Sequence, residues 1–178
     1  MKKCFAKSIA AFLSTLLLVF AASARENCVL TAKTAPLLLN LQTGMSPEQT
    51  QSVFGRDLKI KIKKRGERTF FQNFIKKPAP ASLRGVRALY LRFFDRSLYQ
   101  IEIFYEPRAD LKTLDDITTA LSSQLNFSVS DWKIEYNLAE IFCGETSLVA
   151  DNVLNPRVEL TDEAIRAKVE ATREKDKK

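Results

Sequence analysis

Two apolar segments separated by only three residues constrain the fold of this chain more than any other feature. Residues 86–94 and 98–105 are rich in aromatic and branched side chains, and Asp95, Arg96 and Ser97 link them. Strands joined by so short a link must run antiparallel, because a parallel connection needs a crossover of a dozen or more residues. The sequence therefore predicts an antiparallel sheet that contains this hairpin.

Further short segments extend the pattern. Residues 58–64 alternate strictly between apolar residues and lysines, which predicts a half-buried strand paired with residues 69–75 through a turn at 65–67. Weaker strands are expected at residues 132–136, 139–143, 147–150 and 157–160. Ser46 and Gln49 form a capping-box pattern for a short helix that ends at Gly55, residues 114–125 form an amphipathic helix, and another helix starts near Thr161. The expected class is α+β, an antiparallel β-sheet with helices packed on one face plus a C-terminal helix.

The first 24 residues have the pattern of a secretory signal peptide. Three lysines precede an apolar run over residues 9–20, and the small residues Ala22, Ser23 and Ala24 follow. The apolar run is shorter than the roughly 20 residues of a membrane-spanning helix, and no later segment is apolar enough to span. We expect cleavage between Ala24 and Arg25, one α+β domain over residues 25–160, and a charged helical tail over 161–178. The product would be exported, to the periplasm or outside the cell.

Two cysteines remain after such a cleavage, Cys28 and Cys143. An even number of cysteines in an exported chain predicts a disulfide, although two buried thiols or one reactive thiol are the alternatives. Closing so long a loop would stabilise the fold by about 4–5 kcal/mol in the chain-entropy account.

The composition excludes several kinds of active site. The chain has no histidine, so it holds no Ser-His-Asp or Cys-His catalytic group and no histidine-ligated metal. Its five glycines do not form a phosphate-binding loop. We therefore expect no catalytic residues, no metal and no cofactor.

Charge is distributed unevenly along the chain. Residues 56–96 carry 13 bases and 3 acids, whereas residues 97–178 carry 10 bases and 16 acids. This asymmetry indicates one basic surface that binds an anionic partner, either an envelope component or a protein; export disfavours nucleic acid. The candidate binding residues are Lys59, Lys61, Lys63, Lys64, Arg65 and Arg68. The alternative is a solvated strand face whose lysines discourage edge-to-edge pairing.

Two carboxylate pairs and a set of aromatic residues are weaker candidates. Glu102 with Glu106, or Asp115 with Asp116, would supply the two carboxyl groups of a glycoside hydrolase. Strand neighbours and the helix dipole explain the same residues equally well. The aromatic residues form either a binding platform or part of the core: Tyr90, Tyr99, Tyr105 and Trp132.

The segment 41–50, LQTGMSPEQT, together with Gly55 resembles the Gly-Met-Ser/Thr opening of the SmpA/OmlA envelope proteins, and residues 89–101 resemble the hairpin of that family. The resemblance covers about residues 41–105. It implies a barrel-assembly accessory fold, shared with β-lactamase-inhibitor-like domains, in which a short helix leads into antiparallel strands. No lipid-acceptor cysteine follows the leader and Ser97 replaces the hairpin glycine, so secreted proteins of this type without an assigned function are the closer comparison.

These observations together favour an exported, soluble, non-enzymatic protein that acts by binding. A carboxylate-based cell-wall hydrolase and a secreted protein-inhibitor module are the alternative hypotheses.

Overall fold

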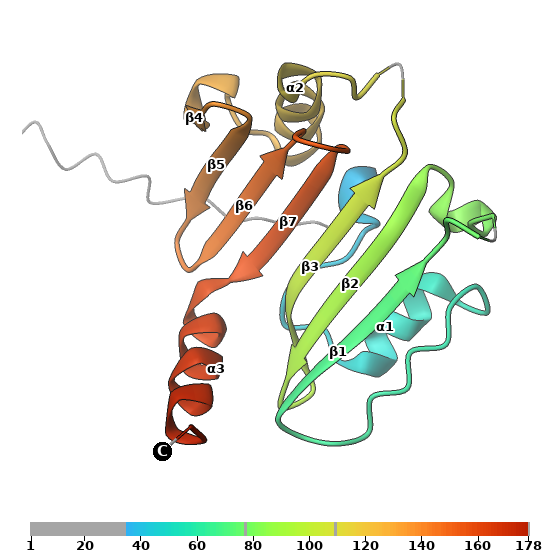
Figure 1. The fold of residues 1–178 in the computed structure, drawn as a ribbon, viewed down its shortest axis with the longest axis vertical. Coiled ribbons are helices and arrows are strands. Elements are labelled where there is room, and N and C mark those ends of the chain that lie inside the picture. Colours follow the sequence, from blue (N-terminus) through green and yellow to red (C-terminus); the bar gives the residue numbers. More distant parts are fainter. Residues whose placement is uncertain (1–34, 77, 109, 178) are drawn as a thin grey trace, which may run out of the picture.

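The structure is a computed structural model that describes residues 35–76, 78–108 and 110–177. Its described part contains a seven-stranded sheet in the order β1-β2-β3-β7-β6-β5-β4, antiparallel throughout (Figure 1). The strands are β1 (Glu67–Asn73), β2 (Val86–Phe94), β3 (Ser97–Tyr105), β4 (Lys133–Glu135), β5 (Leu138–Cys143), β6 (Thr146–Asp151) and β7 (Arg157–Asp162). The expected α+β class with an antiparallel sheet is confirmed.

Two helices cover one face of the sheet. Helix α1 (Pro47–Phe54) lies behind β1 and β2 in Figure 1, and α2 (Leu114–Leu125) lies behind the strands of the other half. The main core is enclosed between these helices and the sheet, and its fully buried side chains include Leu89, Leu91, Phe93, Ile101, Ile103, Ile117 and Leu121. The opposite face, which we call the open face, carries the polar side chains of the central strands.

Both helices begin at a capping box, which the sequence predicts for α1. The Ser46 hydroxyl accepts a hydrogen bond from the Gln49 N–H, and the Gln49 side chain accepts one from the Ser46 N–H. Thr113 and Asp116 make the same reciprocal pair at the start of α2. These contacts satisfy N–H groups that have no partner within the helix, and so they fix where each helix begins.

The two halves of the chain are similar but not identical, since three strands follow α1 and four strands follow α2. In each half a capped helix precedes a run of antiparallel strands, and the last strand of each run lies at the centre of the sheet. Those two strands, β3 and β7, pair with each other, with Ile101 opposite Leu160. The order of helix and strands is therefore similar in the two halves, although their sequences show no visible repeat.

The central hairpin is tighter than the sequence suggests. Ser97 belongs to β3, so Asp95 and Arg96 alone form the turn, both with positive φ, 47° and 70°. Such two-residue turns match the right-handed twist of the flanking strands. A register shift between Arg92 and Phe93 follows, and beyond this bulge the Tyr99 hydroxyl reaches the open face, where it contacts Glu67.

The prediction of a strand at residues 58–64 is wrong, because this segment pairs with no strand of the described structure. Its alternation is real: Leu58, Ile60 and Ile62 are buried and the lysines between them are exposed. The Gln51 side chain replaces a neighbouring strand by accepting a bond from the Ile60 N–H at 2.7 Å and donating to the Leu58 carbonyl at 2.6 Å. Strand β1, expected at 69–75 beside this segment, pairs with β2 instead.

Helix α3 (Glu163–Lys175) follows β7 directly and contacts the open face rather than the helix-covered face. Ser147 on that face donates a hydrogen bond to Glu163, and Arg173 forms a bidentate ion pair with Glu67 of β1. Val169 is the one large apolar side chain of α3 that is buried, at 2% exposure. The helix thus closes one end of the open face.

The leader and Cys28 lie outside the described residues, so cleavage at Ala24–Arg25 and the Cys28–Cys143 disulfide stay predictions. Cys143 ends β5 and is buried. Within the described ranges no helix is long and apolar enough to cross a membrane.

Candidate binding surface

The six candidate cations lie on one continuous stretch of chain that leads into β1. Lys59, Lys61 and Lys63 alternate with the buried isoleucines, and all three are exposed. The next three cations, Lys64, Arg65 and Arg68, are exposed as well. We call these six residues the basic segment. Among the described residues, none of the six forms an ion pair with an acid.

The three acids of this region form no ion pair with the basic segment, and each makes a contact elsewhere. Asp57 accepts a hydrogen bond from Ser82, and Asp95 accepts one from the Gly66 N–H at 2.9 Å. Glu67 is paired with Arg173 of α3. The six cations are therefore exposed to solvent without an ion-pair partner among the described residues.

Side chains from two other elements hold the backbone of the basic segment in place. Besides the Gln51 contacts, Arg96 donates from Nη1 to the carbonyls of Ile62 and Lys63, at 3.3 and 3.4 Å. Arg96 is itself fixed by an ion pair with Glu48 of α1. The lysine side chains are exposed, and the chain that carries them is held at defined points beside the core.

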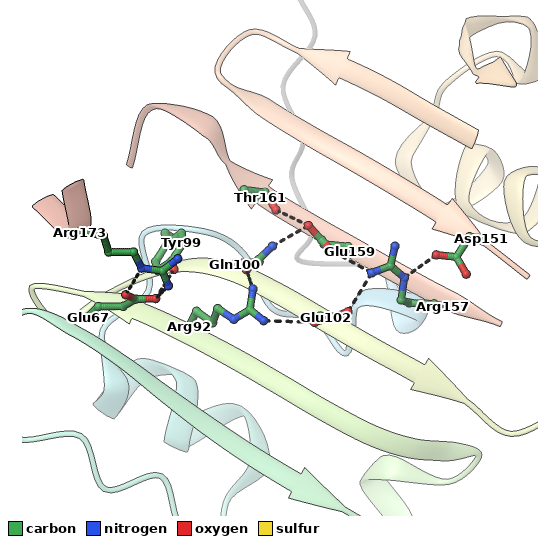
Figure 2. A network of polar contacts seen from close by, with 10 residues as sticks. All are labelled: Glu67, Arg92, Tyr99, Gln100, Glu102, Asp151, Arg157, Glu159, Thr161 and Arg173. Atoms are coloured by element: carbon green, nitrogen blue, oxygen red, sulfur yellow. Dashed lines mark hydrogen bonds and ion pairs between the residues drawn. The ribbon is translucent and has the colours of Figure 1, made fainter. Parts of the chain in front are cut away.

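A network of charged residues occupies the open face, and it is satisfied internally (Figure 2). Arg157 of β7 contacts Glu102 at 2.9 Å and Glu159 at 3.2 Å, and it also pairs with Asp151 of β6. Burial opposes the charge of Arg157, but the hydrogen bonds with Glu102 and Asp151 outweigh it and raise the pKa of Arg157. Buried charges are retained when they are paired in this way, so the network is a structural element of the sheet.

The network extends across the central strands through neutral side chains. Gln100 donates to Glu159 at 2.6 Å and accepts from Arg92, while Thr161 donates to Glu159 at 3.2 Å. Figure 2 shows these side chains pointing toward one another from β2, β3 and β7. Sequence reasoning did not find this cluster, since its members are far apart in the chain and meet only when β3 pairs with β7.

The carboxylates considered for hydrolysis serve structural contacts. Glu102 is only 9% exposed, because it lies between Arg92 and Arg157. Asp116 caps α2, and the hydrogen bonds from Thr113 and the backbone of Lys112 hold its pKa below the usual value. Asp115 is exposed in the first turn of α2, and Glu106 is exposed just beyond β3. The positions of these four carboxylates give no support to the hydrolase hypothesis.

Two of the four aromatic candidates, Tyr105 and Trp132, are core residues, whereas Tyr99 is buried outside the core cluster with its hydroxyl on Glu67 of the open face. Tyr99, Tyr105 and Trp132 are buried, and burial raises the pKa of Tyr99 to about 12, with the charge of Glu67 adding to the shift. Tyr90 differs, since it lies on the open face with its ring 4.4 Å from the ring of Phe71 and 5.9 Å from that of Phe104. The aromatic group of the open face is therefore Phe71, Tyr90 and Phe104, two of which sequence reasoning missed.

The described residues contain no group of three or more acidic or cysteine side chains that could hold a metal ion. A hollow of about 550 Å³ beside α1 is lined by uncharged residues: Gln42, Thr43, Gly44, Met45, Gln49, Ser52 and Val53. Another, of about 290 Å³, lies near Tyr105 and has Arg84, Arg108 and Asp110 at its rim, where Arg108 and Asp110 pair with each other. Neither hollow contains the pair of carboxylates that glycoside hydrolysis requires or any residue of the basic segment.

The comparisons with known protein families, curated proteins and solved structures gave no match to this chain. The resemblance of residues 41–105 to the SmpA/OmlA proteins accordingly stays a prediction.

Proposed function

We propose that this chain is an exported, non-enzymatic protein that binds an anionic component of the cell envelope, or an anionic protein within it, through the basic segment. The observation that carries the proposal is the set of six exposed cations without acidic partners in the described structure, on a backbone that Gln51 and Arg96 hold in place. Lysines that only keep a surface soluble do not need a backbone that is held in place by side chains of other elements.

Electrostatics gives this surface its affinity and its dependence on salt. Unpaired cations concentrated on one side of a molecule attract anionic partners over about a Debye length, roughly 8–10 Å at physiological ionic strength. The acidic second half of the chain, residues 97–178, gives the molecule a charge asymmetry that orients it. The leader and the Cys28–Cys143 bridge belong to the same proposal, because both fit a protein that acts outside the cytoplasm.

The test is sedimentation of the purified mature protein with washed envelope material from an exporting cell. The charge-reversed variant Lys59→Glu, Lys61→Glu, Lys63→Glu is compared with the wild-type protein at low and high salt. We expect wild-type binding that weakens with salt and a loss of about tenfold or more in the variant, because three contacts of roughly 0.5–1 kcal/mol each become repulsive.

The matched control reverses the same number of charges on the last helix and the residues after it, as Lys168→Glu, Lys175→Glu and Lys177→Glu. These lysines are exposed and distant in sequence from the basic segment. The control is expected to bind like the wild-type protein. Equal losses in the two variants would show a general effect of net charge, and unchanged binding in the first would contradict the assignment of the surface.

A further inference from the structure

One edge of the sheet is open along the whole of β1. Strand β1 is the first strand in the sheet order, and within residues 35–76, 78–108 and 110–177 it pairs with β2 alone (Figure 1). The opposite edge is β4, which has three residues against the seven of β1. Long unpaired edges offer a row of backbone N–H and C=O groups to another chain.

The register shows which groups of β1 point outward. Phe74 donates its N–H to the Arg87 carbonyl at 2.9 Å, and the Gly66 carbonyl accepts from the Asp95 N–H at 3.2 Å. Hydrogen-bonded positions alternate in an antiparallel ladder, so the even-numbered residues of β1 face β2. The backbone N–H and C=O groups of the odd-numbered residues therefore point away from the sheet: Glu67, Thr69, Phe71 and Asn73.

Local side chains cover only the two ends of this outward row. The Glu67 carbonyl accepts from Arg68 Nη1 at 2.6 Å, and the Asn73 carbonyl accepts from Gln72 Nε2 at 3.2 Å. Within the described residues, no such contact reaches the outward backbone groups of Thr69 and Phe71. The middle of the edge is ready to form a ladder with another strand.

The side chains around this edge specify the chemistry of that strand. On the open face Phe71 is 49% exposed and lies stacked on Tyr90, so it offers an apolar contact. On the helix-covered side Arg68 is exposed, and the chain enters β1 directly from Lys63, Lys64 and Arg65. Because neighbouring side chains across a ladder interact in pairs, apolar residues would face Phe71 and acids would face Arg68.

We propose that the outer edge of β1 accepts an extended acidic segment of a partner protein as an additional antiparallel or parallel strand. A second copy of this chain fits poorly, since pairing β1 with itself would bring together two stretches that each carry 13 bases and 3 acids. The proposal deepens the proposed function, because it rests on the basic segment and names a protein strand as the anionic partner.

The experiment uses a fluorescent nine-residue peptide that alternates valine and glutamate, and a counterpart with lysine in place of glutamate. Anisotropy titrations compare the wild-type mature protein with Thr69→Pro, which removes one outward N–H without touching the ladder to β2. The matched control is Thr69→Ala, which keeps that N–H. We expect the acidic peptide alone to bind, with affinity about tenfold lower for Thr69→Pro and nearly unchanged for Thr69→Ala.

Amide hydrogen exchange in the wild-type protein gives a readout that does not depend on the folding of a variant. The acidic peptide is expected to slow exchange at Thr69, Phe71 and Asn73, while Phe70 and Gln72, already bonded to β2, change little. No peptide binding, or binding without protection of the odd-numbered amides, would overturn the proposal.

The same measurements separate this proposal from the function on which it rests. If envelope binding is lost on reversal of Lys59, Lys61 and Lys63 but the β1 amides stay unprotected, the basic segment remains the binding surface and the proposal of an added strand is wrong. Protection of β1 by the peptide without any envelope binding would remove the proposed function and keep the edge as a protein-binding site.

Discussion

At the scale of single residues, a few polar side chains do the work that secondary structure does elsewhere. Gln51 is the clearest case, since one amide group bonds to the Gly55 carbonyl, the Leu58 carbonyl and the Ile60 N–H. Arg96 acts similarly on Ile62 and Lys63. These two side chains explain how an extended segment with strand-like alternation keeps its place without a neighbouring strand.

Replacing Gln51 by alanine is expected to destabilise the protein by about 1–3 kcal/mol, because the Ile60 N–H loses its partner beside buried side chains. Urea unfolding measures the effect. Gln42→Ala is the matched control, since Gln42 is half-buried and its side chain makes no hydrogen bond with the described residues. Equal unfolding midpoints for Gln51→Ala and the wild-type protein would contradict this role.

At the scale of elements, α3 is attached to the rest of the fold through a small number of contacts. Val169 is buried, Glu163 bonds to Ser147, and Arg173 pairs with Glu67. The remaining side chains of the helix are mostly exposed. The Arg173–Glu67 ion pair is one of these few contacts, so the attachment depends in part on the charge of Glu67.

Acid is expected to release α3. The hydrogen bonds from Arg173 hold the pKa of Glu67 below its usual value of 4.5, although burial opposes the shift. A carboxyl whose pKa is lowered by folding stabilises the native state above its ordinary pKa, and that contribution is lost as the pH falls through the lowered value. The protection of the α3 amides, measured relative to their intrinsic exchange rates at each pH, should therefore fall as the pH drops below 4.5.

The variants Glu67→Gln and Glu174→Gln make this prediction specific. Glu67→Gln should lower the protection of the α3 amides already at neutral pH. Because the Glu67–Arg173 ion pair is then absent, acidification should lower that protection little further. Glu174 is exposed on α3 and forms no ion pair with a described residue, so its variant should behave like the wild-type protein. An α3 that stays equally protected in all three proteins would show that the ion pair is not what attaches it.

At the scale of the whole molecule, the structure joins two similarly built halves across the β3–β7 pair, while their charges differ. The first half carries the basic segment and the open edge of β1, and the second half is acidic and ends in α3. This division supports a molecule in which one half provides most of the contact surface.

The expected Cys28–Cys143 bridge would tie the start of the mature chain to β5 in the second half. Cys143→Ser should lower the free energy of unfolding by about 4–5 kcal/mol relative to the oxidised wild-type protein, and Cys28→Ser should lower it equally. The mass of the exported protein, before and after reduction and alkylation, checks the bridge and the start at Arg25 together. Thiols that are alkylated without reduction, or an intact leader, would contradict this part of the account.

Local patterns predicted most elements but not their arrangement. A capping box located α1, helical spacing of apolar residues located α2, and the short link located the β2–β3 hairpin, because these signals lie within a few residues of one another. The pairing of β3 with β7 joins residues that are far apart in sequence, and no local signal encodes it. For the same reason the Arg157 network and the true neighbour of β1 were visible only in the structure.

The misassigned segment at residues 58–64 shows the limit of periodicity. Alternation reports that one side of an extended chain is buried, and Ile60 and Ile62 are indeed buried. It does not report whether the backbone bonds to a strand or to side chains such as Gln51. The candidate cations are nevertheless exposed as expected, and for Lys59, Lys61 and Lys63 this exposure follows from the alternation.

The most direct test of the central claim is site-specific photo-crosslinking in the intact exporting cell. A photoreactive amino acid is placed at Lys61 in the basic segment, and at Lys168 on the exposed face of α3 as the control. The account predicts a defined adduct from position 61 that weakens at high salt, and none from position 168. Adducts from position 168 alone, or equal labelling from both positions, would contradict the claim that the basic segment is the contact surface.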